Sequence, residues 1–126
     1  MRCPCRKVSE TVAYEQCCGP IHKDARAAKL AVQLMRARYC AYAMGNLAFV
    51  RDSWHPETRP PHIDPSDGER WISLKIIDSR EAGDEATVSF AARSQIKGRA
   101  SVLSETSRFR RVSGCWYYLD GIVAGA

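Results

Sequence analysis

The sequence predicts an α+β fold in which a curved antiparallel four-stranded sheet carries a long helix and a short helix on one face. Two features along the chain support this prediction. Apolar residues recur at helical spacing from residue 24 to residue 54, and the period becomes two after residue 68. An irregular, cysteine-rich segment precedes the helices. The chain of 126 residues, 45% hydrophobic and 26% charged, has the composition of a globular protein.

Two helices are predicted after the first 22 residues. Asp24 is a suitable N-cap for a long helix that continues through about residue 44, and Gly45 is a suitable stop. Asn46 can then cap a short helix over residues 47–54, which a His-Pro pair ends. The apolar positions of the long helix are Ala27, Leu30, Ala31, Leu34 and Ala41.

The second half of the chain is predicted to be a β-meander. Residues 57–68 carry three prolines and one glycine and are predicted to be a loop. The segments after it alternate with period two and are separated by two-residue turns, which require antiparallel neighbours. The predicted strands are 70–80, 85–96, 99–112 and 115–123, and the turns are Gly83-Asp84, Lys97-Gly98 and Ser113-Gly114. A long helix lying across such a curved sheet forms a cone with a cavity at its wide end.

Four cysteines fall within the first eighteen residues, in the pattern Cys3-x-Cys5, eleven residues, Cys17-Cys18. Zn²⁺ prefers four soft ligands in a tetrahedron, and two ligand pairs joined by a short loop can supply them. A disulfide within either pair would close a strained ring, and cross-pairing conflicts with a reducing compartment. We therefore predict one Zn²⁺ on Cys3, Cys5, Cys17 and Cys18. Unliganded thiols, or His22 in place of Cys18, are the alternatives.

The predicted zinc is structural, because four protein ligands leave no coordination position for a substrate or an activated water. The flanking Arg2, Arg6 and Lys7 are placed to screen the negative charge of the thiolates, through hydrogen bonds to sulfur. Cys40 and Cys115 each stand alone in an apolar segment, and both are predicted to be buried core residues.

The charge of the chain, +5 in total, is unevenly distributed. Residues 1–50 hold eight Lys or Arg against three Asp or Glu, residues 51–90 hold five against nine, and residues 91–126 hold six against two. Basic regions favour a polyanionic partner such as RNA, the ribosome or an acidic protein, and a solvated surface with patchy charge is the alternative. Because the sequence shows neither a long apolar stretch nor a secretory signal, we expect a cytoplasmic protein with no membrane partner.

Several motifs resemble those of known bacterial proteins. Cys3-Pro4-Cys5 together with Tyr14-Glu15-Gln16-Cys17-Cys18-Gly19-Pro20 resembles the SEC-C motif, the zinc-binding tail first seen in the SecA translocation ATPase. The rest of the chain resembles the YchJ-like family of uncharacterised bacterial proteins. The stretches that carry this resemblance are residues 34–41, 54–56, 88–93, 105–109 and 116–121.

The resemblance implies a SEC-C zinc knuckle over residues 1–22 and a nuclear transport factor 2-like cone over residues 23–126. It also implies the zinc role for the four N-terminal cysteines. The sequence departs from the family pattern in two places. Arg6-Lys7 stand where the family usually has Gly-Ser, and the spacing to the cysteine pair is longer, so we expect a differently turned loop. The second, C-terminal SEC-C motif of many relatives is not found before Ala126.

Cones of this kind often hold a small-molecule pocket, so polar residues near the cone mouth are candidates for chemistry. His55 would be a general base if Asp120 oriented it, and the alternative is that His55 closes a helix end. Arg93 either reaches solvent or lines the cavity, and a pair with Glu105 is possible. The full set of candidates is Tyr39, His55, Arg93, Glu105, Tyr117 and Asp120. No nucleotide loop, HExxH or nucleophile elbow occurs, so we assign no catalytic residue, and the sequence favours a protein that is not an enzyme.

The predicted function is that of a zinc-containing interaction or adaptor module. By analogy with other SEC-C tails, the expected partner is another protein, such as an acidic export chaperone or a translocation- or ribosome-associated protein. Two alternatives stay open: a small enzyme or ligand binder that uses the cone cavity, and an RNA- or ribosome-associated binding protein. The sequence leaves the oligomeric state open.

Overall fold

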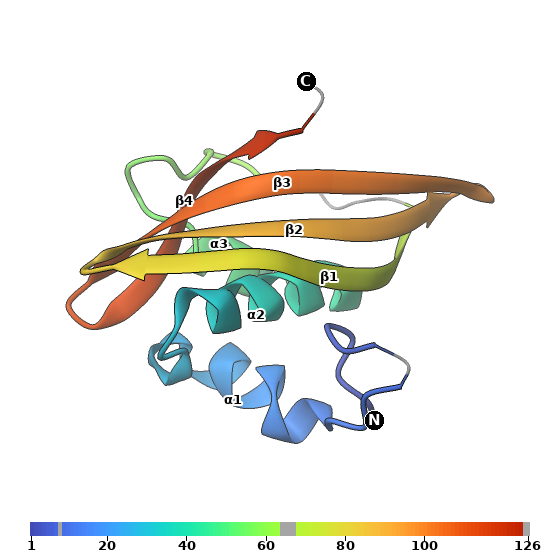
Figure 1. Cartoon of the computed structure of the whole chain (residues 1–126), viewed down its shortest axis with the longest axis horizontal. Helices are drawn as coiled ribbons and strands as arrows, with labels where there is room; N and C mark the ends of the chain where they lie inside the picture. Colours follow the sequence, from blue (N-terminus) through green and yellow to red (C-terminus); the bar gives the residue numbers. More distant parts are fainter. Residues whose placement is uncertain (8, 64–67, 125–126) are drawn as a thin grey trace.

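The structure, a computed structural model, describes residues 1–7, 9–63 and 68–124. Four antiparallel strands form one sheet in the order β1-β2-β3-β4, so the predicted meander is confirmed (Figure 1). The strands are β1 Glu69–Ala82, β2 Glu85–Ile96, β3 Arg99–Val112 and β4 Cys115–Val123. The last three have the predicted bounds, and β1 is longer than predicted at both ends. Residues 57–63 and 68 lie outside helices and strands, as predicted for this loop, and its other positions lie outside the described residues.

Tight turns fix the register of the meander. Lys97 and Gly98 both have positive φ angles, 51° and 79°, and Ser113 and Gly114 repeat the pattern with 52° and 79°. Two successive positive φ angles are typical of the type I′ turn, whose twist matches that of the paired strands. This is why short Lys-Gly and Ser-Gly dipeptides were sufficient to locate the ends of β2, β3 and β4.

The sheet is curved because its register slips at three places. In β1 the pairing with β2 shifts between Trp71 and Ser73 and again between Ile76 and Asp78. In β3 the pairing with β4 shifts between Arg108 and Phe109. Such bulges bend a strand and increase its twist. The side chains of the concave face that are buried against the helices include Leu74, Val88, Phe90, Ala92, Phe109 and Trp116.

The long helix is shorter than predicted. Asp24 does act as a cap, since its carboxylate accepts a hydrogen bond from the backbone N–H of Arg26, but it caps only the 3-10 turn η2 (Ala25–Ala27). The helix α2 spans Ala31–Met44. The helix does not continue from η2 into α2, because side chains of the β-strands form hydrogen bonds with the backbone groups of residues 29 and 31. The carbonyl of Lys29 accepts from the indole of Trp116 at 3.3 Å, and the N–H of Ala31 donates to Glu81 at 2.7 Å.

The short helix α3 spans Leu47–Asp52, and Asn46 caps it as predicted by accepting from the N–H of Phe49. It ends two residues before the predicted Trp54. Ser53 and His55 instead bond to the backbone of Tyr118 in β4, at 2.9 and 2.7 Å. This strand-like contact draws the chain away from the helix axis.

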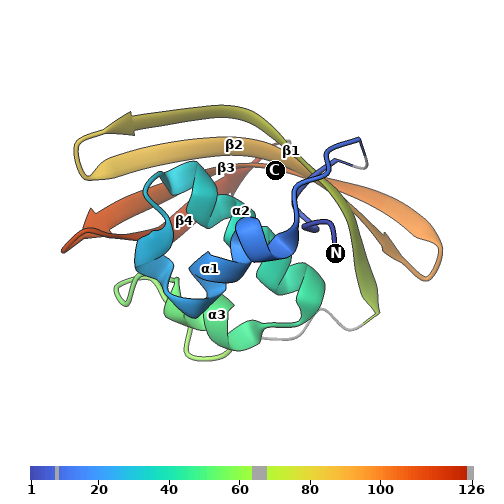
Figure 2. The same ribbon diagram turned by 90° about the horizontal axis from the view of Figure 1, so that it is seen from below.

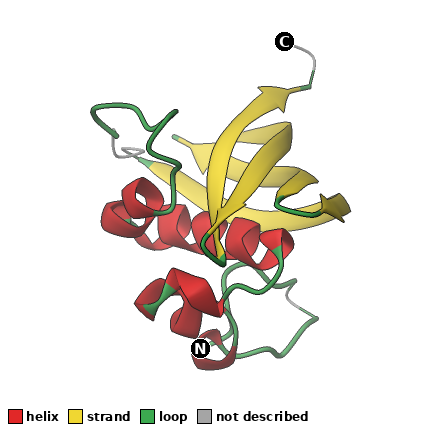
Figure 3. Cartoon of the chain, turned by 90° about the vertical axis from the view of Figure 1, so that its left-hand side faces the viewer, coloured by secondary structure: helices red, strands yellow, loops and turns green. Residues whose placement is uncertain are grey.

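The elements stack in three layers (Figures 2 and 3). The sheet forms one outer layer, α2 lies in the middle, and the N-terminal loop with η1 (Tyr14–Gln16) and α1 (Cys18–Lys23) lies on the other side of α2. Eight of the residues of α2 are buried: Ala31, Leu34, Met35, Ala37, Arg38, Tyr39, Cys40 and Ala41. In the part of the chain that the structure describes, no helix has the length and apolar character needed to span a membrane.

Candidate functional site

The N-terminal loop is a short irregular hairpin that places two pairs of cysteines opposite each other. Arg2 and Ala13 form an antiparallel bridge, and the N–H of Cys3 donates to the carbonyl of Val12 at 2.9 Å. The chain turns back after Cys3, where the N–H of Arg6 donates to the Cys3 carbonyl. After the hairpin, η1 leads directly into α1, whose first residue is a cysteine. The first pair is therefore held by the turn and the second by the start of a helix.

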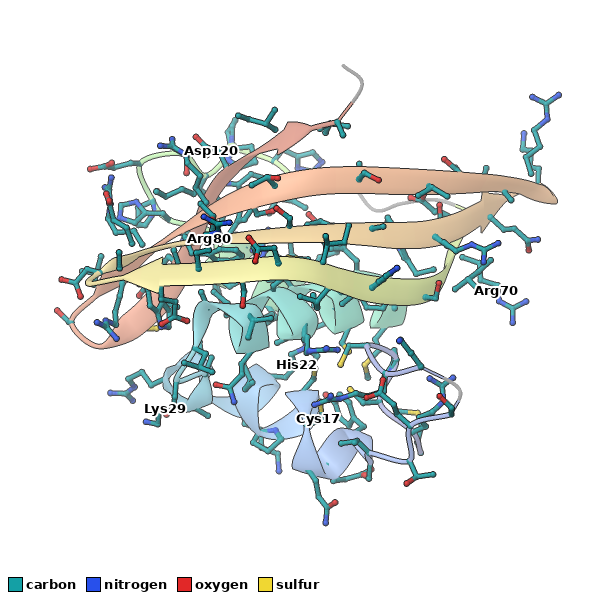
Figure 4. All side chains as sticks on the ribbon, in the orientation of Figure 1. Cys17, His22, Lys29, Arg70, Arg80 and Asp120 are labelled. Carbon is teal, nitrogen blue, oxygen red and sulfur yellow. The ribbon has the colours of Figure 1, made fainter. Side chains whose placement is uncertain are left out.

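The four predicted ligands meet at one point. The Sγ atoms of Cys3, Cys5, Cys17 and Cys18 all lie within 4.8 Å of one another. Four of the separations are 3.6 Å for Cys3–Cys5 and Cys5–Cys17, 3.7 Å for Cys5–Cys18 and 3.9 Å for Cys17–Cys18. Sulfur atoms bound at 2.3 Å to one tetrahedral metal lie about 3.8 Å apart. The spacing therefore fits a single metal ion, and the four cysteines could hold one. In Figure 4 the sulfur atoms gather between the N-terminal layer and α2.

The cluster is shielded from solvent. Cys3, Cys5 and Cys18 are at most 1% exposed and belong to the same apolar cluster as the core of α2 and the sheet, and Cys17 is half-buried. None of the six cysteines forms a disulfide. Three of the four predicted sulfur ligands are thus buried in the core, and only Cys17 lies near solvent.

A fifth cysteine belongs to the cluster, and the sequence did not reveal it. Cys40 of α2 is fully buried, as predicted, but its Sγ lies 3.4 Å from the Sγ of Cys3. Cys40 is not one of the four cysteines that could hold one metal ion together. Cys40 therefore contacts the cluster from the helix side as a hydrogen-bond partner of Cys3. A contact between residues 37 positions apart leaves no local signal in the sequence.

The pKa values of the thiols separate into two groups. Hydrogen bonds with Cys18 and Cys40 hold the pKa of Cys3 far below its usual range, and the hydrogen bond with Cys18 contributes most to lowering the pKa of Cys5, to about 6. The hydrogen bond to Cys3 raises the pKa of Cys18, and burial raises that of Cys17. The contacts within the cluster thus favour the thiolate form of Cys3 and Cys5 over that of Cys17 and Cys18.

His22 is engaged elsewhere and is not placed as a ligand. Its Nε2 lies 2.8 Å from the carbonyl of Ala37, and its Nδ1 lies 2.7 Å from the hydroxyl of Tyr14. A carbonyl only accepts, so Nε2 carries the proton and Nδ1 accepts from Tyr14. The imidazole also contacts the ring of Phe49 at a centroid distance of 4.7 Å. His22 therefore joins α1 to α2 and α3. The group of described residues that could hold a metal ion consists of cysteines.

Two arginines and a glycine complete the surroundings of the cluster. The guanidinium of Arg6 interacts with the sulfur of Cys17, which raises the pKa of Arg6, and Arg6 also pairs with Glu10 at 3.6 Å. Arg2, which we had expected to face sulfur, donates instead to the carbonyl of Arg6. Arg36 of α2 donates to the carbonyl of Cys5 at 2.9 Å and so fixes the loop to the helix.

Gly19, which follows the cysteine pair, cannot carry a side chain without moving its neighbour. A Cβ at Gly19 would lie 2.9 Å from the backbone oxygen of Tyr14 and 3.2 Å from its ring. Glycine is therefore required where α1 passes over η1, next to the ligands.

The proposed dyad of His55 and Asp120 does not form. Asp120 is held by Arg108 through two hydrogen bonds of 2.6 and 2.7 Å, and this guanidinium lowers the pKa of Asp120. His55 accepts from the N–H of Glu57 at 3.1 Å, just beyond the end of α3. The structure thus favours the helix-end role of His55 over that of a general base. Asp120 lies on the sheet side of the molecule, far from the layer of Cys17 and His22 (Figure 4).

The cone does enclose a cavity, of about 140 Å³, between α2 and the concave face of the sheet. Two of the candidates line it. Tyr39 is buried, which raises its pKa to about 12, and Glu105 accepts hydrogen bonds from Ser107 and Tyr118. Arg93 is exposed and does not line the cavity, because strand alternation places it on the other face from Phe90 and Ala92.

Two further predictions need correction or comment. Cys115 is half-buried at the first position of β4 rather than a core residue, because the strand begins at the edge of the core there. Tyr117 lies outside the cavity, with its ring 5.9 Å from that of His55. Neither residue belongs to the cysteine cluster.

Comparison with known proteins places the chain in a family. A model of the middle, NTF2-like domain of YchJ matches residues 30–121, which is most of the chain. This chain belongs to the YchJ-like family. Its relatives include UPF0225 proteins from Xanthomonas oryzae pv. oryzae (44% identical over 94% of this chain and 92% of the relative) and Streptomyces coelicolor (41% identical, 94% and 93%).

Two solved structures share the architecture of this YchJ-like chain. One is the solution structure of a SEC-C motif containing protein from Rhodopseudomonas palustris, with a TM-score of 0.84 and 31% identity over 97% of this chain and 98% of the other. The second is the crystal structure of a sec-c motif containing protein from Psychrobacter arcticus, with a TM-score of 0.79 and 23% identity over 100% and 84%. The second likeness concerns the fold alone.

Proposed function

We propose that this YchJ-like chain binds one structural Zn²⁺ through Cys3, Cys5, Cys17 and Cys18. The observation that carries the proposal is the spacing of their sulfur atoms, 3.6 to 3.9 Å for the four separations given above, which fits one tetrahedral ion. Four sulfur ligands in a tetrahedron are typical of zinc or of iron. The likeness of the segment to the SEC-C motif favours zinc.

The metal would supply the folding free energy that the N-terminal layer lacks. The described residues of the segment 1–17 form an isolated bridge and one 3-10 turn and no longer helix or strand, so little regular structure holds them. Metal binding contributes on the order of 10 kcal/mol in small zinc peptides. With its ligand shell closed, the ion would order this layer and take no part in a reaction.

The ordered layer would then serve as the surface that binds a partner protein. It carries exposed basic side chains on both the loop and the segment that leads to α2: Arg2, Lys7, Lys23, Arg26 and Lys29. Such a surface favours an acidic protein. A reducing compartment is part of the proposal, because the cysteines have to stay reduced in order to bind zinc as thiolates.

Native mass spectrometry with elemental analysis tests the metal. We expect one zinc per wild-type chain, a loss of the zinc in Cys18→Ser, and full retention in the matched control Cys115→Ser, which removes a cysteine outside the cluster. Zinc retained by Cys18→Ser, or iron in place of zinc in the wild type, would contradict the proposal.

The partner is tested by pull-down after treatment with nuclease. We expect the wild type and Cys115→Ser to retain an acidic protein that both Cys17→Ser/Cys18→Ser and Lys7→Glu/Lys23→Glu lose. Equal retention by all variants would count against an interaction role for the layer. Material that the nuclease removes would indicate RNA instead.

A further inference from the structure

The cavity between α2 and the sheet has properties that the proposed metal site does not explain. At about 140 Å³ it is close in size to cavities of roughly 150 Å³ that admit a benzene molecule in another protein. Its lining comes from α2, the sheet and Trp54, and it includes none of the cysteines of the cluster. The cavity therefore does not depend on the metal proposal.

The walls of the cavity are aromatic. Tyr39 and Trp71 meet edge to face with ring centroids 5.9 Å apart, and Trp54 and Tyr118 meet in the same way at 4.9 Å. All four residues line the cavity. Rings pack well against the face or edge of another ring, so the walls favour a flat, ring-sized occupant.

Two hydrogen-bond donors in these walls have no partner. The indole N–H groups of Trp54 and Trp71 are buried and make no hydrogen bond within the described part of the chain. An unsatisfied buried donor costs about 1–3 kcal/mol, and native proteins rarely leave one without a reason. By contrast, the third indole, that of Trp116, donates to the carbonyl of Lys29. Both unsatisfied donors belong to residues that line one cavity, which points to a ligand with hydrogen-bond acceptors.

The cavity also contains a buried cation. Arg38 is 3% exposed, and its guanidinium lies 4.3 Å from the ring centroid of Tyr118 and 5.1 Å from that of Trp54. Its Nη1 donates to the carbonyl of Val50 and the hydroxyl of Ser53, at 2.9 and 2.7 Å. Among the described residues it makes no direct ion pair, although the charge of Glu105 in the same cavity stabilises it. Burial lowers its pKa to about 10, so the guanidinium stays charged at neutral pH.

The carboxylate in the cavity, that of Glu105, is already committed. It accepts from the hydroxyls of Ser107 and Tyr118, at 2.5 and 3.4 Å. Gly121 on β4 leaves the space in which this side chain lies, because a Cβ there would clash with the carboxylate. The polar groups of the cavity that lack a partner are thus donors rather than acceptors.

We propose that the cavity binds a small aromatic carboxylate. Its ring would lie between the aromatic walls, and its oxygens would accept from the indoles of Trp54 and Trp71 and face the guanidinium of Arg38. This binding site is independent of the zinc site and of the partner surface. The chemistry that selects the ligand is a planar ring of benzene size with a single negative charge.

The test is a titration of the zinc-loaded, ¹⁵N-labelled protein with sodium benzoate, followed by NMR of the three indole N–H signals. We expect saturable shifts of the Trp54 and Trp71 signals with a Kd of about 0.1–1 mM, ordinary for a ligand of this size, and a constant Trp116 signal. Benzamide, the neutral analogue, should bind at least tenfold more weakly, and acetate should cause no saturable shift.

Variants separate the contributions of the residues. Trp71→Phe keeps the ring and removes the donor, so it should weaken benzoate binding about fivefold, whereas the matched control Trp116→Phe should leave it unchanged. Arg38→Met should abolish the preference for benzoate over benzamide. If Arg38→Met fails to fold, the Trp71→Phe result stands alone. Absence of saturable shifts, equal or tighter binding of benzamide, or an unchanged affinity in Trp71→Phe would overturn the proposal.

Discussion

The two faces of α2 present opposite chemistry. On the face toward the N-terminal layer, Cys40 contacts a cluster of thiols that is rich in electron pairs and suited to a cation. On the face toward the sheet, Arg38 and two indoles form a cavity that is rich in donors and suited to an anion. The thiols of the cluster contact one another, whereas the indole N–H groups of Trp54 and Trp71 have no hydrogen-bond partner among the described residues. The cluster can therefore be tested by the pH dependence of metal binding, and the cavity by the binding of an anionic ligand.

The pH dependence of metal binding should separate the two regions most strongly. Hydrogen bonds lower the pKa of Cys3, and that of Cys5 to about 6, whereas the pKa values of Cys17 and Cys18 are raised, so we expect two thiolates and two thiols in the metal-free cluster at neutral pH. Zinc binding then releases about two protons, so the apparent affinity rises about 100-fold per pH unit above pH 6. Below pH 6 the dependence becomes steeper, because Cys5 also takes up a proton.

Competition with a chromophoric chelator between about pH 6.5 and 8 measures this slope, and calorimetry in two buffers counts the protons. Benzoate binding in the cavity should be flat over the same range, because Arg38 stays charged well below its pKa of about 10. A metal affinity independent of pH would contradict the assignment of thiols and thiolates.

Two glycine substitutions compare how tightly the backbone is packed beside the cluster and beside the cavity. Gly19→Ala places a Cβ against the backbone of Tyr14, which cannot move without disturbing the loop, and should cost about 1–3 kcal/mol of stability together with metal affinity. Gly121→Ala displaces the side chain of Glu105, which can rotate away but then gives up its hydrogen bonds with Ser107 and Tyr118, and should cost about 1–2 kcal/mol without a loss of metal. Chemical denaturation of the two zinc-loaded variants measures both.

The same two variants should also differ in zinc content and in the NMR signals of the cavity indoles. Gly19→Ala is expected to leave the indole signals of the cavity in place, and Gly121→Ala is expected to shift those signals while zinc stays bound. If both variants lost zinc equally, the cluster and the cavity would not be separate.

The smallest expected loss of zinc affinity concerns the contact between Cys3 and Cys40. The pKa of Cys40 is raised: its contact with Cys18 lowers it, but its contacts with Cys3 and Cys5 and its burial outweigh that effect. The raised pKa favours Cys40 as the donor in its contact with the sulfur of Cys3. Cys40→Ala removes this donor and should lower zinc affinity about tenfold with the stoichiometry still one. Chelator competition measures the change, and Cys115→Ala is the matched control. A complete loss of zinc would instead make Cys40 a ligand.

The sequence predicted those parts of the fold that depend on local signals. Strand bounds followed from alternation and from glycine turns such as Lys97-Gly98, and the ligand candidates followed from the spacing of four cysteines. The break before α2 was missed, because it depends on Trp116 and Glu81, which are 87 and 50 positions away from their partners. Cys40 and the unpaired indoles were missed for the same reason, since their roles depend on which distant residues face them. His55 and Asp120 were wrongly paired because Arg108 is the nearer partner of Asp120.

The position of α2 between two layers also limits how the chain can change during evolution. A helix at a surface can vary freely on one side, but eight of the 14 residues of α2 are buried against one neighbouring layer or the other. A larger residue on either side would push the helix toward the opposite layer. Substitutions in the N-terminal layer and substitutions in the sheet are therefore coupled through this helix. The two layers can diversify only if they change together or if α2 stays unchanged.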